Sequence, residues 1–143
     1  MNLTFNATAK SENITKTVVK TNGFTIIIDE PERLGGTNDG ANPVEYLLAA
    51  FAGCLNVVGN LVAREMGFTL NGLEINLEGD LDPSKFMGQP SDNRAGYKAI
   101  RVNLNPDTDA DEATLKRWLE VIEDRCPVSD TLSHGTVVQL GIS

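Results

Sequence analysis

Two cysteines, Cys54 and Cys126, are the residues of this 143-residue chain whose types and surroundings best suit chemistry. A thiolate is a nucleophile, and two thiols that can meet form a reversible disulfide. Cys54 lies within an almost wholly apolar segment, residues 42–60. Cys126 follows Ile122 by one helical turn, so it continues the apolar face of a second predicted helix. Two thiols that are distant in sequence and meet in one core could form a redox pair.

A structural role is the simpler interpretation of each cysteine. A free cysteine is often a small buried hydrophobe, and both thiols would then be inert toward thiol reagents. Arg125 precedes Cys126 and would lower the pKa of a thiol if its guanidinium pointed inward. Alternatively, Arg125 is a solvated arginine that favours the C-terminal end of its helix. The residues alone leave these choices open.

Composition excludes several other classes of protein and site. The net charge of −8, from 12 basic and 20 acidic residues, makes nucleic acid an unexpected partner because acidic surfaces repel phosphates. One histidine and two widely separated cysteines form neither a zinc ligand set nor a disulfide framework. No stretch reaches the roughly 18 uninterrupted apolar residues of a membrane span, and the N-terminus does not read as a secretory signal. We expect a cytoplasmic protein without metal, cofactor or membrane partner.

Local patterns predict an α+β fold with mainly antiparallel strands, as a single domain over residues 1–143. Asn22-Gly23 supplies the positive φ angles of a type I′ turn and predicts a β-hairpin. Asn42 is a good N-cap for a helix that runs to Met66, where Gly67 ends it. The other predicted elements are strands near residues 3–8, 68–81, 97–106 and 136–142, a polar loop at 82–96, and a helix from Thr108 or Asp109 to Arg125.

The helix at residues 43–66 carries apolar side chains around most of its circumference. Such a helix must be buried on several sides, and a chain of this length has few elements with which to surround it. A second copy, packed across a two-fold axis, would cover the remaining sides. Gly53 and Gly59 cost about 1 kcal/mol each in this helix relative to alanine, so we expect each to have a packing reason. The pattern therefore predicts an intertwined homodimer with this helix near its centre.

The segment "DEPERLGGTNDGANPVEYLLAAFAGC", followed later by "CPVSDTL", resembles the OsmC/Ohr family of osmotically inducible protein C and organic hydroperoxide resistance proteins. The resemblance covers nearly the whole chain. It implies an OsmC-like fold, with antiparallel sheets wrapped around long central helices in an intertwined homodimer. It also implies a thiol peroxidase that reduces organic hydroperoxides in oxidative-stress defence. By this resemblance, Cys54 is the peroxidatic thiol, Cys126 is the resolving thiol, and an external dithiol is the reductant.

The same resemblance implies that an arginine, oriented by a glutamate, assists the thiol, and the matching residues here are Arg33 and Glu45. Each also has a structural interpretation: Arg33 as an exposed loop arginine, and Glu45 as the partner of Asn42 in a capping box. Glu45 is one position closer to Cys54 than the glutamate of the peroxidases, whose place Val44 takes. This shift motivates the alternative of a small-molecule or lipid-binding dimer that keeps the fold without peroxidase turnover.

Overall fold

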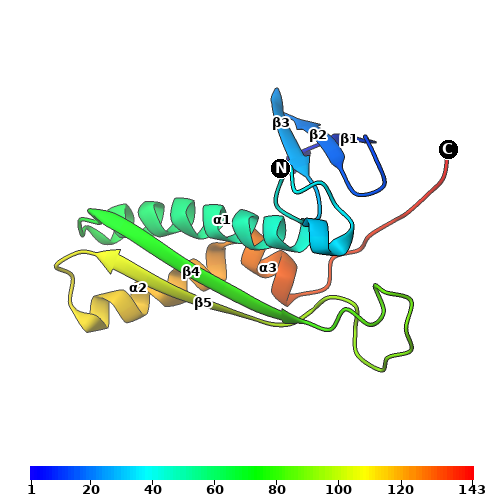
Figure 1. The fold of residues 1–143 in the computed structure, drawn as a ribbon. Coiled ribbons are helices and arrows are strands. Elements are labelled where there is room, and N and C mark those ends of the chain that lie inside the picture. Colours follow the sequence, from blue (N-terminus) through cyan, green and yellow to red (C-terminus); the bar gives the residue numbers. More distant parts are fainter. The chain divides into compact units, whose positions relative to one another are not determined.

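All 143 residues are described by a computed structural model, which has the α+β fold class predicted from the sequence, with antiparallel strands (Figure 1). The chain divides into two compact units, residues 1–49 and residues 50–143. The elements are β1 (Thr8–Ser11), β2 (Thr17–Thr21), β3 (Phe24–Ile28), a 3-10 turn η1 (Glu32–Leu34), α1 (Pro43–Met66), β4 (Gly72–Leu81), β5 (Tyr97–Asp107), α2 (Glu112–Arg125) and α3 (Pro127–Ser133).

The first unit is built on an antiparallel sheet with the strand order β1-β2-β3. Asn22 and Gly23 join β2 to β3 with φ angles of 49° and 80°, which confirms the predicted hairpin turn. The strand predicted near residues 3–8 begins only at Thr8, where pairing with Lys20 starts. The residues before Thr8 have the pattern of a strand but no ladder of hydrogen bonds, so their propensity alone does not make them one.

A buried carboxylate ties this hairpin to the loop that follows β3. Asp29 is fully buried. It accepts hydrogen bonds from the hydroxyl of Thr15 (2.8 Å), the hydroxyl of Thr37, and the backbone N–H groups of Glu30 (2.8 Å) and Asp39 (3.2 Å). These donors, led by Thr37, hold the pKa of Asp29 well below its ordinary value of 3.8. The conformation of the loop is therefore stabilised by hydrogen bonds to a buried carboxylate as well as by its turns.

Two glycines of the same loop let its backbone lie directly on the backbone of β3 and the residues after it. A Cβ atom at Gly36 would overlap the carbonyl oxygen of Glu30, and one at Gly40 would overlap that of Ile27. No side chain other than hydrogen fits at either position. The glycine-rich composition of this segment thus reflects close backbone contact as well as turn geometry.

Asp29 leads to a pH-dependent prediction. We expect Asp29→Asn to lower the thermal midpoint at pH 7, because the amide brings a donor to a site already filled with donors. The folded pKa of Asp29 lies below the unfolded one, so its contribution exists above pH about 4 and is lost as the pH falls toward the folded pKa. The difference between wild type and variant, measured by thermal unfolding from pH 7 to pH 2, should therefore shrink on acidification. Exposed Asp92→Asn is the control; a constant difference would contradict the assignment.

The second unit packs the β4–β5 hairpin against α2 and the α1 residues from Ala50 on (Figure 1). Side chains alternate between buried and exposed along both strands, so one face of the hairpin covers the helices. The centre of the core is formed by Phe51, Leu55, Val58, Val62, Ala63, Trp118, Ile122 and Cys126. This arrangement places α1, which carries Cys54, beside α2, which ends one residue before Cys126.

Trp118 fixes α2 on α1. Its side chain is 2% exposed, and its indole N–H donates a 2.8 Å hydrogen bond to the carbonyl of Gly59. A Cβ atom at Gly59 would lie 3.2 Å from the Trp118 ring and 3.4 Å from Leu73, so the expected packing reason for this glycine is confirmed. A Cβ atom at Gly53 would meet nothing within 4 Å, so within one chain the same expectation fails there.

The second helix begins later than predicted. Asp111 is its N-cap and accepts a 2.8 Å hydrogen bond from the N–H of Thr114, so α2 starts at Glu112. Thr108, one of the two predicted caps, donates instead to the carbonyl of Thr69 at 2.6 Å. Several adjacent Asp and Thr residues are all competent caps, so residue type alone does not select Asp111.

The predicted strand at residues 136–142 is wrong for the single chain. These residues form no regular structure and are exposed; Val137, Leu140 and Ile142 are 87%, 96% and 103% exposed. Alternation of β-branched and polar residues indicates strand propensity, yet a strand exists only where another strand supplies hydrogen bonds. No element of the same chain does so here.

Helix α1 leaves part of its apolar surface uncovered, as its sequence predicts. Leu47, Val57 and Leu61 are 39%, 66% and 41% exposed. Helix α1 is long and apolar enough to cross a membrane by length and composition alone. Core helices of soluble proteins meet the same criteria. A homodimer that covers this surface stays a prediction.

Candidate functional site

The two cysteines lie against each other in the second unit. Cys54 stands on α1, Cys126 stands between α2 and α3, and their sulfur atoms are 3.0 Å apart. Both are free thiols. A disulfide has a bond length of about 2.05 Å, so a two-electron oxidation could join the sulfur atoms after an approach of about 1 Å. The expectation that the two thiols meet in one core agrees with this geometry.

A break between two helices positions Cys126. Its N–H donates to the carbonyl of Ile122 (2.9 Å), closing α2, and its carbonyl accepts from the N–H of Asp130 (3.0 Å), opening α3. Pro127 disfavours helical backbone at the residue before it and suits the first position of a new helix. Cys126 accordingly has extended backbone, with φ −77° and ψ 112°. Pro127 ends the regular helix as predicted, whereas α3 after it was not predicted.

The two thiols have different surroundings. Cys126 is fully buried, whereas Cys54 is partly exposed. Burial raises the pKa of Cys126, and so does the hydrogen bond with Cys54, while the N–H of Ser129 acts in the opposite direction. The Cys126 thiol thus remains a hydrogen-bond donor to the sulfur of Cys54. An incoming molecule could reach Cys54, and Cys126 would stand behind it as a second thiol.

Both cysteines belong to the apolar core of the second unit. Cys126 is one of its buried residues, and Cys54 is one of the partly buried residues packed against it, as are Val121, Val128 and Leu132. The chain contains no group of His, Cys, Asp and Glu residues that could hold a metal ion. The site can therefore do thiol chemistry in apolar surroundings: nucleophilic attack by one sulfur and disulfide formation with the other.

Arg125 is an exposed residue in the last turn of α2, as the second interpretation of its sequence position has it, and it also has a partner on α1. Its guanidinium binds the carboxylate of Glu65, in the last turn of α1, through two hydrogen bonds of 2.5 and 3.2 Å. The hydrogen bond from Arg125 lowers the pKa of Glu65. The arginine is thus paired across two helices. Sequence reasoning missed Glu65, because no local spacing relates it to Arg125.

Arg33 and Glu45 lie in the first unit, residues 1–49. Arg33 is exposed in η1. Glu45 accepts a 3.0 Å hydrogen bond from the N–H of Asn42, whose side-chain oxygen accepts a 2.9 Å bond from the N–H of Glu45. This reciprocal pair confirms the capping box. Of the four residues singled out from the sequence, the structure brings Cys54 and Cys126 together, and a role of Arg33 and Glu45 beside them stays a prediction.

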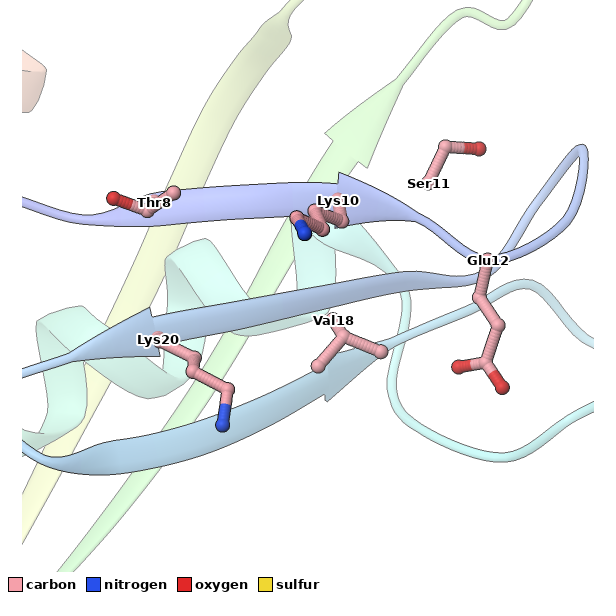
Figure 2. Close-up of a pocket in the computed structure, with 6 residues that line it drawn as sticks. All are labelled: Thr8, Lys10, Ser11, Glu12, Val18 and Lys20. Atoms are coloured by element: carbon pink, nitrogen blue, oxygen red, sulfur yellow. The ribbon is translucent and has the colours of Figure 1, made fainter.

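A separate cavity of about 430 Å³ lies over β1 and β2 of the first unit. Figure 2 shows the side chains that line it: Thr8, Lys10, Ser11, Glu12, Val18 and Lys20. Its polar groups are exposed lysines, hydroxyls and a carboxylate, and it holds no thiol. The chemistry described above therefore belongs to the second unit.

The chain is similar to a known protein family, to a relative of known sequence and to solved structures. The family model described as OsmC-like protein matches residues 36–141. A protein of Mycoplasma genitalium named hydroperoxide reductase is 30% identical over 97 residues, which are 68% of this chain and 64% of that protein. The crystal structure of an OsmC-like protein from Mycoplasma pneumoniae has a TM-score of 0.82 at 24% identity, covering 94% of this chain and 91% of the other. An organic hydroperoxide resistance protein OsmC from Legionella pneumophila has a TM-score of 0.65 at 20% identity, covering 91% and 89%.

Proposed function

Because the chain belongs to the OsmC-like protein family, we propose that it is a thiol-dependent peroxidase that reduces organic hydroperoxides in oxidative-stress defence. Cys54 is the peroxidatic thiol and Cys126 the resolving thiol. The single observation that supports this assignment most is the 3.0 Å separation of the two sulfur atoms. The difference in burial supports these roles. The substrate must reach the peroxidatic thiol, and Cys54 is partly exposed. The resolving thiol needs to contact only Cys54, so Cys126 can be buried.

The proposed reaction has three steps. The Cys54 thiolate attacks the outer oxygen of R–O–O–H, the O–O bond breaks, and the alkoxide takes a proton to leave as an alcohol while Cys54 becomes a sulfenic acid. The sulfur of Cys126 then attacks the sulfenic sulfur; an S–S bond forms, the S–O bond breaks, and water leaves. An external dithiol reduces the disulfide by thiol–disulfide exchange and is itself oxidised.

Apolar surroundings favour an alkyl hydroperoxide over hydrogen peroxide, because the alkyl group is then removed from water. The first step uses the thiolate form of a cysteine, which a neighbouring positive group stabilises. Arg125 is already paired with Glu65. The family resemblance implies that this group is Arg33, oriented by Glu45.

The proposed enzyme is a homodimer. The exposed apolar side chains of α1 and the unpaired, strand-like residues 136–142 support this, because a second copy would cover the former and supply a neighbouring strand to the latter. Sedimentation equilibrium is expected to give twice the chain mass of 15.4 kDa. A mass of one chain at micromolar concentration would reject the dimer.

The test of the activity uses the purified chain with cumene hydroperoxide and dithiothreitol. We expect the hydroperoxide to be consumed over many turnovers, and hydrogen peroxide to be consumed more slowly. Equal consumption of the two peroxides would reject the apolar substrate class. No consumption of either would reject the peroxidase.

The alternative function is a small-molecule or lipid-binding dimer without significant peroxidase turnover. The capping box favours it, because Glu45 is already engaged with Asn42. Mass spectrometry after mild treatment with cumene hydroperoxide separates the two proposals. A Cys54–Cys126 disulfide supports the peroxidase, whereas two unmodified thiols and a copurifying ligand support the binding protein.

A further inference from the structure

Arg125 and Glu65 join α2, which ends directly before Cys126, to α1, which carries Cys54. Arg125 is the last residue of α2 and directly precedes Cys126, and Glu65 lies in the last turn of α1. The guanidinium meets both carboxylate oxygens, at 2.5 and 3.2 Å. A planar fork bound at two points fixes direction as well as distance. A second hydrogen bond between α2 and α1, from the indole of Trp118 to the carbonyl of Gly59, lies two helical turns earlier on α2.

We propose that the Glu65–Arg125 ion pair is a positioning device that holds Cys126 in reach of Cys54. The disulfide step of the proposed function is the premise of this inference. Cys126 lies at a break in the helix, where its backbone is extended and the following helix has only seven residues. The last turn of α2 therefore determines where its sulfur stands. Anchoring that turn to α1 restricts the motion of Cys126 and raises the effective concentration of the two thiols.

The geometry also limits the size of the effect. The side chains of Arg125 and Glu65 are 37% and 49% exposed, so solvent and salt screen their attraction. The buried contacts of Trp118 and Ile122 remain when the pair is lost. We therefore expect the loss of either partner to lower the effective concentration of the thiols about threefold, a change typical of a partly exposed ion pair. The thiols should still form a disulfide.

The experiment measures the thiol–disulfide equilibrium of the full chain with reduced and oxidised glutathione, which requires no peroxide. Arg125→Gln and Glu65→Gln are each expected to lower the effective concentration about threefold. Arg125→Lys keeps the positive charge and loses the planar, two-point hydrogen bonding. Its effective concentration should lie between those of the glutamine variants and the wild type. In 1 M sodium chloride the wild type should approach the Arg125→Gln value, because salt screens the pair.

Arg101→Gln is the matched control. Arg101 is 49% exposed and binds Glu78 and Asp80 across the β4–β5 hairpin, so its removal breaks ion pairs of the same unit away from the thiols. We expect it to leave the glutathione equilibrium unchanged, even where its thermal midpoint falls as far as that of Arg125→Gln.

Three outcomes would decide between the explanations. A lower thermal midpoint of Arg125→Gln with an unchanged glutathione equilibrium would show a purely structural ion pair and overturn the proposal. A wild type that forms no Cys54–Cys126 disulfide would overturn both this proposal and the peroxidase. The expected threefold shift in a protein that consumes no hydroperoxide would overturn the peroxidase alone and keep the positioning role.

Discussion

Cys54→Ser is expected to reduce hydroperoxide consumption to the background rate, a loss on the order of 10³-fold or more. A serine hydroxyl has no accessible anion near neutral pH and no stable product with the transferred oxygen. The measurement is the initial rate of cumene hydroperoxide loss with dithiothreitol in excess. The fold should survive, because sulfur is exchanged for a slightly smaller oxygen at a partly exposed site. Comparable thermal midpoints of the two proteins are the control for this.

Cys126→Ser is the matched variant, since it removes the other sulfur of the pair. It should keep the first turnover, because Cys54 can still attack the peroxide. Without a resolving thiol, the sulfenic acid at Cys54 is left open to further oxidation. Mass spectrometry with rising hydroperoxide should therefore find sulfinic acid at Cys54 in this variant and the disulfide in the wild type. A Cys126→Ser protein that loses its first turnover, beside a fully active Cys54→Ser protein, would reverse the roles assigned to the two thiols.

The parts of the fold that the sequence predicted well depend on local chemistry. Asn22-Gly23 determines its turn because few other residue pairs adopt two positive φ angles. Asn42 and Gly67 mark the ends of α1 because each satisfies backbone groups within its own turn. Neither signal requires a partner from elsewhere in the chain.

The parts that were wrong depend on contacts distant in sequence. Helix α2 starts at Glu112 rather than near Thr108, whose hydroxyl donates to the carbonyl of Thr69. A contact with so distant a residue cannot be predicted from a local capping pattern. The strand predicted at residues 136–142 lacks a neighbour in its own chain. Sequence patterns report what a segment can do, and the surrounding elements determine whether it does so.

The candidate site divides in the same way. The meeting of Cys54 and Cys126 could be anticipated because Cys54 lies within an apolar helix and Cys126 directly follows one with an apolar face. The buried faces of one core converge. The partner of Arg125 could not, because a charged residue on a helix surface has many possible partners and only the packing of α2 on α1 selects Glu65. Arg33 and Glu45 were identified by resemblance alone, and they remain a proposal.

Trp118→Ala is expected to have the largest effect on stability, a loss of about 3–5 kcal/mol in the free energy of unfolding. The substitution removes a side chain that is 2% exposed and contacts Phe68 edge to face at 6.2 Å between ring centres. It also leaves the carbonyl of Gly59 without the indole donor. Urea denaturation at one fixed protein concentration measures the loss, because the stability of a dimer would depend on concentration.

Trp118→Phe separates packing from the hydrogen bond, since it keeps most of the apolar contact and removes the donor. Its loss should be about 1–2 kcal/mol. If Trp118 places α2 on α1, Trp118→Ala should also lower the effective concentration of the two thiols under conditions where the protein is still folded, and by more than Arg125→Gln does. The buried indole is the stronger of the two links between the helices. A Trp118→Ala protein with a reduced free energy of unfolding and a wild-type glutathione equilibrium would show that the two sulfur atoms are held together by something other than the packing of α2 on α1.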